Sequence, residues 1–359
     1  MSDELYHELR ALLDKFPRGY VETKSGVEIK ILKKLFTEAD AKLTVQLSTV
    51  PEEIHDIAAR LEWDIDDLRQ RLDEIANKGL IFRIRRGDKA YYRAAAYAIG
   101  LYEYSVVRMD KELAELFRQY YEEAYVESKG EHKIPGFKVL PVEQGIDMES
   151  VLLPYQRVEQ SIREARKIAV SDCPCRKEAI LLGEGCDHPL ENCLCFGAAA
   201  EYYIEAKLGR EISADEAIKI LKEADESGLV HAGANSVHLS NICNCCPCCC
   251  LGLKTLVQKG SIREKHFNPI FEPVIDEDSC TACEVCVERC PVDAIVVEDF
   301  AQVDRDKCLG CGLCTGTCPV EAITMVVRDD VTHPFSNVKD LANAVMEAKG
   351  KEPLTVKTK

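Results

Sequence analysis

The stretches CTACEVCVERCP (280–291) and CLGCGLCTGTCP (308–319) decide the fold of the C-terminal part of this chain. Each contains four cysteines separated by two, two and three residues, with a proline after the fourth, and the copies are offset by 28 residues. Thiols at such short, fixed spacings in a reducing compartment are metal or redox ligands before they are disulfides. Two zinc sites are the alternative, which the matched copies and their prolines disfavour.

The doubled motif, with the followers VDAI and VEAI, resembles the bacterial dicluster ferredoxins over residues 273–328. The resemblance implies a small two-fold βαβ domain with two [4Fe–4S] clusters. In this motif three cysteines of one half bind a cluster, and the fourth binds the cluster of the other half. The resemblance therefore implies two ligand sets: Cys280, Cys283, Cys286 and Cys318 for cluster I, and Cys308, Cys311, Cys314 and Cys290 for cluster II.

The middle of the chain, residues 151–272, holds 11 of the 19 cysteines in a different pattern, and no cysteine precedes Cys173. We expect a Cys-rich domain of helices and irregular structure here. The candidate ligands fall into two groups along the chain: Cys173, Cys175, Cys186 and Cys193, then Cys243, Cys245, Cys246, Cys248 and Cys249. Cys195 lies two residues after Cys193 on an expected helix, where it would point to a different face.

Eleven thiols exceed the four that one cubane needs and can serve two. We expect one or two additional iron–sulfur clusters in this domain, with a structural zinc or metal-free redox thiols as the alternatives. Arg176, next to Cys175, could stabilise an anionic cluster or lie on a solvated face, and both interpretations stay open.

The first 97 residues contain no cysteine and predict helices over 1–16 and 27–36, a helix opened by Pro51, and a helix from Asp64 to Gly79. A β-hairpin follows over 81–95. Residues 26–97 thus resemble the winged-helix domain, which usually binds DNA. Acidic and basic residues are equal there, and the helix that would enter the groove, DIDDLRQRLDEIANKG, has a net charge of −2. We therefore favour protein docking or a scaffold role over nucleic-acid binding.

Two further segments complete an α+β chain. Residues 98–150 predict a helix and a linker loop containing Gly130, Pro135, Gly136 and Pro141. Residues 329–359 form a C-terminal tail whose last residues, VKTK, are expected to fray. The order of the parts resembles a group of uncharacterised multi-cluster iron–sulfur proteins of anaerobes, a resemblance that brings no activity with it.

Composition limits the possible functions. The formal net charge is −16, which repels nucleic acid and suits a redox partner with a basic docking patch. No apolar run approaches the roughly 20 residues of a membrane span, and the acidic N-terminus lacks the features of an export signal. These observations predict a cytoplasmic protein.

The sequence has no G-x-G-x-x-G after a strand, no P-loop and no H-E-x-x-H motif. We therefore expect an electron-transfer protein that relays single electrons through its clusters. A redox-sensing winged-helix transcription regulator is one alternative. An oxidoreductase subunit with an active middle cluster is the other, so whether the chain is itself an enzyme stays open.

Overall fold

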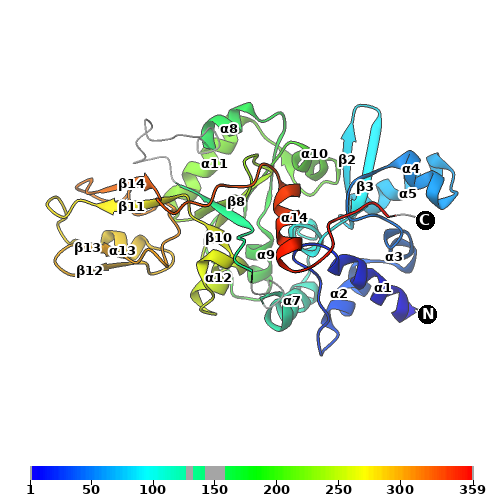
Figure 1. Cartoon of the computed structure of the whole chain (residues 1–359), viewed down its shortest axis with the longest axis horizontal. Helices are drawn as coiled ribbons and strands as arrows, with labels where there is room; N and C mark the ends of the chain where they lie inside the picture. The colour runs from blue at the N-terminus through cyan, green and yellow to red at the C-terminus, as the bar shows by residue number, and fades with distance from the viewer. Residues whose placement is uncertain (1, 127–131, 142–157, 358–359) are drawn as a thin grey trace.

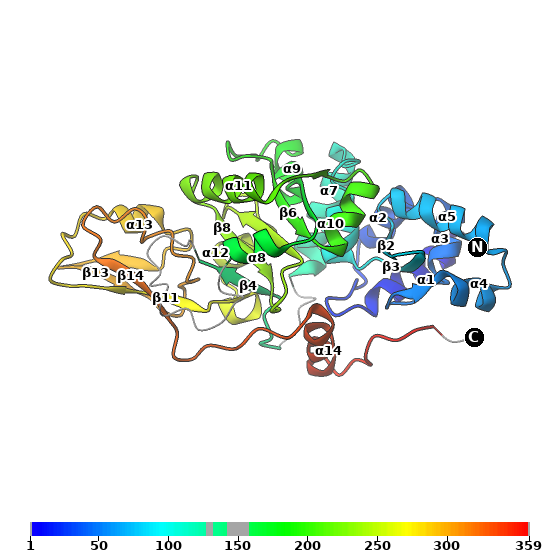
Figure 2. The same ribbon diagram turned by 90° about the horizontal axis from the view of Figure 1, so that it is seen from above.

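Three parts lie side by side along the long axis of the molecule (Figures 1 and 2). The computed structural model describes residues 2–126, 132–141 and 158–357. The helical N-terminal domain forms one end, the Cys-rich domain lies in the middle, and the part that carries the doubled motif forms the other end. Both chain termini lie at the N-terminal domain, because the last segment runs back across the molecule.

The N-terminal domain consists of five helices and a hairpin joined by a short third strand. Its elements are α1 (Ser2–Asp14), α2 (Val27–Leu35), α3 (Glu38–Thr44), β1 (Glu52–Glu53), α4 (Ile54–Leu61), α5 (Ile65–Asn77), β2 (Ile81–Arg86) and β3 (Lys89–Ala94). Two differences from the sequence-based expectation stand out. Helix α3 was not expected, although the capping box of Thr37 and Asp40 marks its start. The helix expected at Pro51 begins at Ile54, because β1 first pairs with β3.

The basic residues of the hairpin are engaged within the molecule. Arg83 lies 2.7 Å from Asp73 of α5 and 2.6 Å from Glu205 of the middle domain. Arg85 contacts the same two carboxylates, and Lys89 contacts Glu53. Three of the five basic side chains of the hairpin therefore bind the protein's own acidic side chains.

Two further helices, α6 (Tyr102–Tyr104) and α7 (Lys111–Tyr120), connect the N-terminal domain to the middle domain. The middle-domain helix α10 (Ala198–Glu205) packs on the hairpin, where the buried Tyr202 hydroxyl donates to the carbonyls of Ala76 and Ile81 at 3.0 and 2.7 Å. The two domains therefore share a core.

The middle domain is built on a seven-stranded sheet, which corrects the expectation of helices and irregular structure. The strand order is β10-β4-β8-β9-β6-β5-β7; β10 and β4 pair in parallel and the other neighbours are antiparallel. The strands are β4 (Phe137–Leu140), β5 (Ile168–Asp172), β6 (Glu191–Phe196), β7 (Arg210–Glu211), β8 (Val230–Ala234), β9 (Asn241–Cys245) and β10 (Phe267–Asn268). They are short, and cysteine and asparagine fill most positions of β6 and β9, so the two central strands carry only a weak strand signal in the sequence.

The two faces of this sheet differ. Apolar residues such as Val170, Leu194 and Ile242 form a core with α8 (Val158–Glu164) and α11 (Ala214–Glu226) on one face. The other face is directed toward the N-terminal domain and carries cysteines. Helices α9 (Pro174–Leu181) and α12 (Leu251–Val257) flank it, and a 3₁₀ turn (Arg263–Lys265) precedes β10.

One strand of the sheet comes from the segment expected to be a linker. Residues Phe137–Leu140 form β4, between Gly136 and Pro141, instead of a loop. Gly130 and the expected boundary at residues 150–151 lie outside the described residues.

The part with the doubled motif consists of two small antiparallel pairs, β11 (Phe271–Ile275) with β14 (Ile323–Val327) and β12 (Ile295–Val297) with β13 (Ala301–Val303). Helix α13 (Val285–Arg289) follows the first two cysteines of the motif and contains the third, Cys286. The equivalent residues of the second half, 313–317, form turns instead of a helix.

The C-terminal tail docks on the N-terminal domain. After α14 (Val338–Ala348), the Lys351 ammonium donates to the Asp14 carbonyl at 2.8 Å. The backbone N–H of Lys357 donates to the Ser48 hydroxyl at 2.7 Å. The tail is thus held as far as Lys357, within the segment expected to fray. Among the described residues, no helix is both long and apolar enough to cross a bilayer.

Replacing Tyr202 with Phe tests the shared core. Loss of the hydroxyl leaves two buried carbonyls without this donor, and we expect a cost of about 1–2 kcal/mol. The apparent midpoint of thermal unfolding, followed by circular dichroism, should fall by about 2–4 °C for each kcal/mol. Tyr91→Phe, on the partly exposed face of the same hairpin, is the control and should shift the midpoint by less than about 1 °C. Equal midpoints for the two variants would contradict a role for Tyr202 in joining the domains.

Candidate iron–sulfur and metal sites

The eight cysteines of the doubled motif surround two separate hollows. One is lined by Cys280, Cys283, Cys286 and Cys318. The other is lined by Cys290, Cys308, Cys311 and Cys314. The fourth cysteine of each half thus lies with the first three of the other half, which is the arrangement that the interleaved ligand assignment requires.

Backbone N–H groups point at the sulfurs in a repeated way. Ala294 N–H donates to Cys290 Sγ at 3.2 Å, and Ala322 N–H, 28 residues later, donates to Cys318 Sγ at 3.3 Å. Each donor lies four residues after the cysteine of a cysteine–proline pair, where the chain turns back over its own sulfur. Such donors stabilise an anionic sulfur, so both hollows suit thiolate ligands.

Gly310 allows the loop of the second hollow to lie against strand β11. Its φ is +65°, and a Cβ there would stand 1.9 Å from the Phe271 carbonyl oxygen. Any other residue would push the cysteine loop away from the strand that supports it.

Burial raises the pKa of Cys311 to about 12 and also raises the pKa of Cys308 and Cys314. These thiols would hold their protons at neutral pH without a cation nearby. Metal ligands must lose those protons, and a cationic core supplies the compensating charge. The hollow therefore fits an iron–sulfur core and is a costly place for free thiolates.

The two hollows differ in their surroundings. Cys283 of the first is exposed, whereas Cys308 and Cys314 of the second are buried. The buried Arg263 of the middle domain donates to the Cys308 carbonyl at 2.8 Å. The second hollow therefore lies next to the middle domain, and the first lies nearer to solvent.

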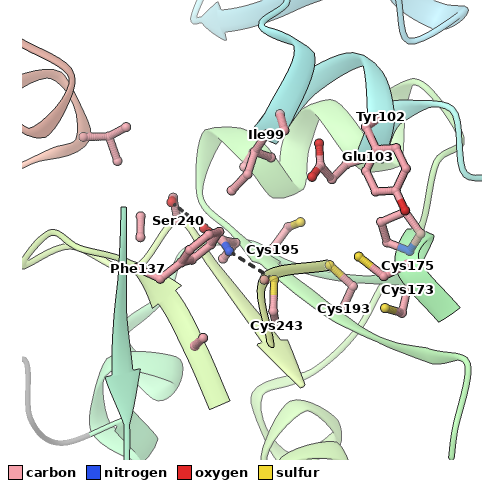
Figure 3. A pocket seen from close by; sticks show the side chains of 18 of the residues that line it. Ile99, Tyr102, Glu103, Phe137, Cys173, Cys175, Cys193, Cys195, Ser240 and Cys243 are labelled. Atoms are coloured by element: carbon pink, nitrogen blue, oxygen red, sulfur yellow. Dashed lines mark hydrogen bonds between the residues drawn. The ribbon is translucent and has the colours of Figure 1, made fainter. Parts of the chain in front are cut away.

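A cavity of about 550 Å³ lies between the middle sheet, the N-terminal domain and the tail, and seven thiols line it (Figure 3). Cys173 and Cys175 come from the start of α9, Cys193 and Cys195 from β6, and Cys243 and Cys245 from β9. Cys250, which precedes α12, completes the set. Five of these seven are among the nine candidate ligands predicted for the middle domain.

Strand geometry explains why sequence reasoning missed Cys195. Residues 191–196 form a strand instead of the expected helix, and side chains two apart on a strand share a face. Cys193 and Cys195 therefore both face the cavity, while Leu194 between them enters the opposite core. The sequence signal for this strand was the alternation of cysteine with other residues in ENCLCF (191–196). Cys250 was missed because nothing in the run CCPCCC distinguishes its last thiol from the others.

The thiols follow one another around the cavity. Cys175 neighbours Cys173 and Cys250, Cys245 neighbours Cys250 and Cys243, and Cys193 neighbours Cys243 and Cys195. This series places sulfurs from four different segments around one space. Such an arrangement suits a core of several metal ions, because one ion takes only about four of them.

The opposite wall comes from the N-terminal domain and carries an acid. Figure 3 shows Glu103 of α6 among the residues that line the cavity together with the thiols. Gly100 N–H donates to its carboxylate at 2.7 Å, yet burial raises the pKa of Glu103 to about 7. The cavity thus combines thiols with a carboxyl group that can hold or release a proton near neutral pH.

The other four candidate ligands, Cys186, Cys246, Cys248 and Cys249, do not line the cavity. They form a separate group, and their sulfurs all lie within 4.8 Å of one another. Arg176, which the sequence left open, is fully buried and donates to Cys246 Sγ at 3.4 Å. The structure therefore divides the candidate ligands differently from the prediction, which grouped them by their order along the chain. The cavity set and the compact set each contain cysteines from both predicted groups.

Comparison with known proteins identifies one part of the chain. Residues 273–325 match the family model of the 4Fe-4S dicluster domain. No curated protein matches the chain. The match supports iron–sulfur clusters as cofactors of the C-terminal part and, with the many cysteines elsewhere, a role in iron–sulfur electron transfer.

Single cysteine replacements test the interleaved assignment. We expect Cys290→Ala and Cys308→Ala to remove the same one of the two ferredoxin-type EPR signals in dithionite-reduced protein, because both line the second hollow. Cys280→Ala and Cys318→Ala should remove the other signal. If Cys290→Ala instead changes the signal that Cys280→Ala changes, each half binds its own cluster and the assignment is wrong.

Proposed function

We propose that this chain is an electron-transfer protein in which two [4Fe–4S] clusters relay single electrons between a soluble redox partner and a third iron–sulfur centre in the thiol-lined cavity. Iron–sulfur clusters accept and release one electron at a time, at potentials set by charge, hydrogen bonds to sulfur and exposure. The proposed order is partner, cluster I, cluster II and then the cavity.

One observation carries this proposal. Leu309, Leu313 and Cys311 of the second hollow pack in the same apolar cluster as Cys243, Cys245 and Cys250 of the cavity. The ligand loop of cluster II and the cavity wall are therefore joined through one continuous contact of apolar side chains. An electron that reaches cluster II has its next acceptor site on the other side of this contact.

The outer end suits a charged partner. Five acidic side chains are exposed on the loops and on helix α13 around the first hollow: Asp276, Glu277, Asp278, Glu284 and Glu288. A concentration of one charge sign attracts a partner of the opposite sign and raises the rate of encounter. We propose a redox protein with a basic patch as the partner at this end.

We propose a scaffold role for the N-terminal domain. Its predicted recognition helix is acidic, and Arg83, Arg85 and Lys89 of the hairpin contact Asp73, Glu205 and Glu53. Glu103 and Tyr102 of the connecting helix form part of the cavity wall. These contacts favour a domain that closes the redox site over one that binds nucleic acid.

A second candidate function is an oxidoreductase whose reaction occurs in the cavity. A volume of about 550 Å³ is within the range of small-molecule sites, roughly 300–1,000 Å³. Glu103 could supply or accept a proton beside the cluster. On this interpretation the same relay would deliver electrons to a bound substrate.

Metal analysis of anaerobically purified protein tests the third centre. We expect about twelve irons per chain, from three cubanes of four. Cys175→Ser combined with Cys250→Ser should remove about four of them and leave both ferredoxin signals intact, since these thiols line only the cavity. The reciprocal control, Cys280→Ser, should remove a ferredoxin signal and spare the cavity centre. About eight irons in the unaltered protein, with no loss in the double variant, would refute a cluster in the cavity.

Charge reversal tests the outer end. We expect Glu277→Lys combined with Asp278→Lys to slow reduction by a cationic viologen radical severalfold at low salt, because the local attraction is lost. Stopped-flow absorbance measures the rate. At about 1 M salt, where the Debye length is about 3 Å, the difference should disappear. Glu347→Lys with Glu352→Lys changes the net charge equally on the distant tail. An equal slowing in that control would show that net charge, and not the face around cluster I, sets the rate.

A further inference from the structure

The four thiols outside the cavity form a compact group. Cys186 lies in the loop after α9, and Cys246, Cys248 and Cys249 lie between β9 and α12. All four sulfurs are within 4.8 Å of one another, and Cys186 Sγ is 3.8 Å from Cys246 Sγ and 3.5 Å from Cys249 Sγ. Cys246 and Cys249 are each 1% exposed.

These distances select a single ion over a cluster. Four thiolates at about 2.3 Å from one tetrahedral zinc stand about 3.8 Å apart, which follows from the bond length and the tetrahedral angle. The four thiolates of a [4Fe–4S] core bind four different irons and are necessarily farther apart. A group in which every pair lies within 4.8 Å matches the first case.

The group is largely enclosed by the protein, and Cys248 alone of its four thiols is exposed. Arg176, with 0% exposure, donates to Cys246 Sγ at 3.4 Å and to the Asn244 carbonyl at 3.4 Å, and it also bonds the Pro189 carbonyl. Ala179, Ala224 and Leu229 pack against the thiols. A cation in a dry shell beside one sulfur offsets the excess negative charge of four thiolates on a divalent ion.

We propose that Cys186, Cys246, Cys248 and Cys249 bind one zinc ion in a tetrahedral, all-thiolate site that is separate from every iron–sulfur centre. Zinc favours four thiolate ligands in closed structural sites and has no redox activity. Of the eleven middle-domain thiols, these four would hold zinc, and the other seven line the cavity.

The position of the ion gives it a structural role. It joins the loop after α9 to the segment between β9 and α12. The same two regions present Cys173 and Cys175, and Cys243, Cys245 and Cys250, to the cavity. The zinc would therefore fix the separation of the segments that build the cavity wall. This inference does not depend on the proposed electron relay.

Zinc K-edge X-ray absorption on the full-length wild-type protein, purified without oxygen from cells grown with both iron and zinc, tests the site without any variant. We expect about one zinc per chain, coordinated by four sulfurs at about 2.3 Å, with no metal neighbour at the distance found in clusters. Zinc bound by nitrogen or oxygen, or iron in place of zinc in this protein, would overturn the proposal.

Two ligand variants and one matched control connect the ion to these residues. Cys248→Ser alters the exposed ligand and should retain at least tenfold less zinc after dialysis against a chelator, with iron and sulfide unchanged. Cys186→Ser should behave alike. The matched control is Cys195→Ser, which alters a buried thiol of the cavity. This variant should retain as much zinc as the unaltered protein. Loss of about four irons with sulfide in Cys248→Ser, or full zinc retention in both ligand variants, would refute the assignment.

Discussion

The pairing of strand β6 with strand β9 is the constraint on which the middle of this molecule depends. Leu194 lies opposite Ile242, and Cys195 lies opposite Asn241. This register sends Leu194 and Ile242 into the apolar core and Cys193, Cys195, Cys243 and Cys245 to the cavity. A slip of one residue in either strand would exchange its two faces and bury thiols where hydrocarbon packs. The core and the thiol-lined cavity are therefore specified by the same backbone hydrogen bonds.

The parts of the chain differ in how far they could be predicted. The cysteines of the doubled motif lie in short loops, so their spacing alone indicates how they gather. The middle thiols come from segments up to 77 residues apart, from Cys173 to Cys250, and which of them meet depends on the sheet. Its central strands β6 and β9 contain Cys and Asn at most of the positions where branched residues would signal a strand. Cys195 was consequently placed on a helix, and the division between Cys186 and its neighbours could not be seen.

The N-terminal half shows a different gap between pattern and structure. Most of its helices and its hairpin follow from apolar periodicity and caps, because those signals are local. The ion pairs of its charged residues cannot be predicted from such local signals. Glu205 is 120 residues from Arg85 in sequence, and the two side chains come together because helix α10 packs on the hairpin. A basic hairpin read alone suggests an external anion. Within the whole chain, its partners are carboxylates of the same molecule, and the domain becomes part of the wall around Glu103 and the thiols.

Residues 329–357 leave the ribosome after all 19 cysteines, yet Asn337 and Val338 supply one wall of the cavity and the segment beyond them is tied to Asp14 and Ser48. The segment that covers this side of the cavity is thus synthesised after every thiol that lines it. This wall is completed only when the segment docks on the N-terminal domain, although the segment lies far in sequence from all seven thiols.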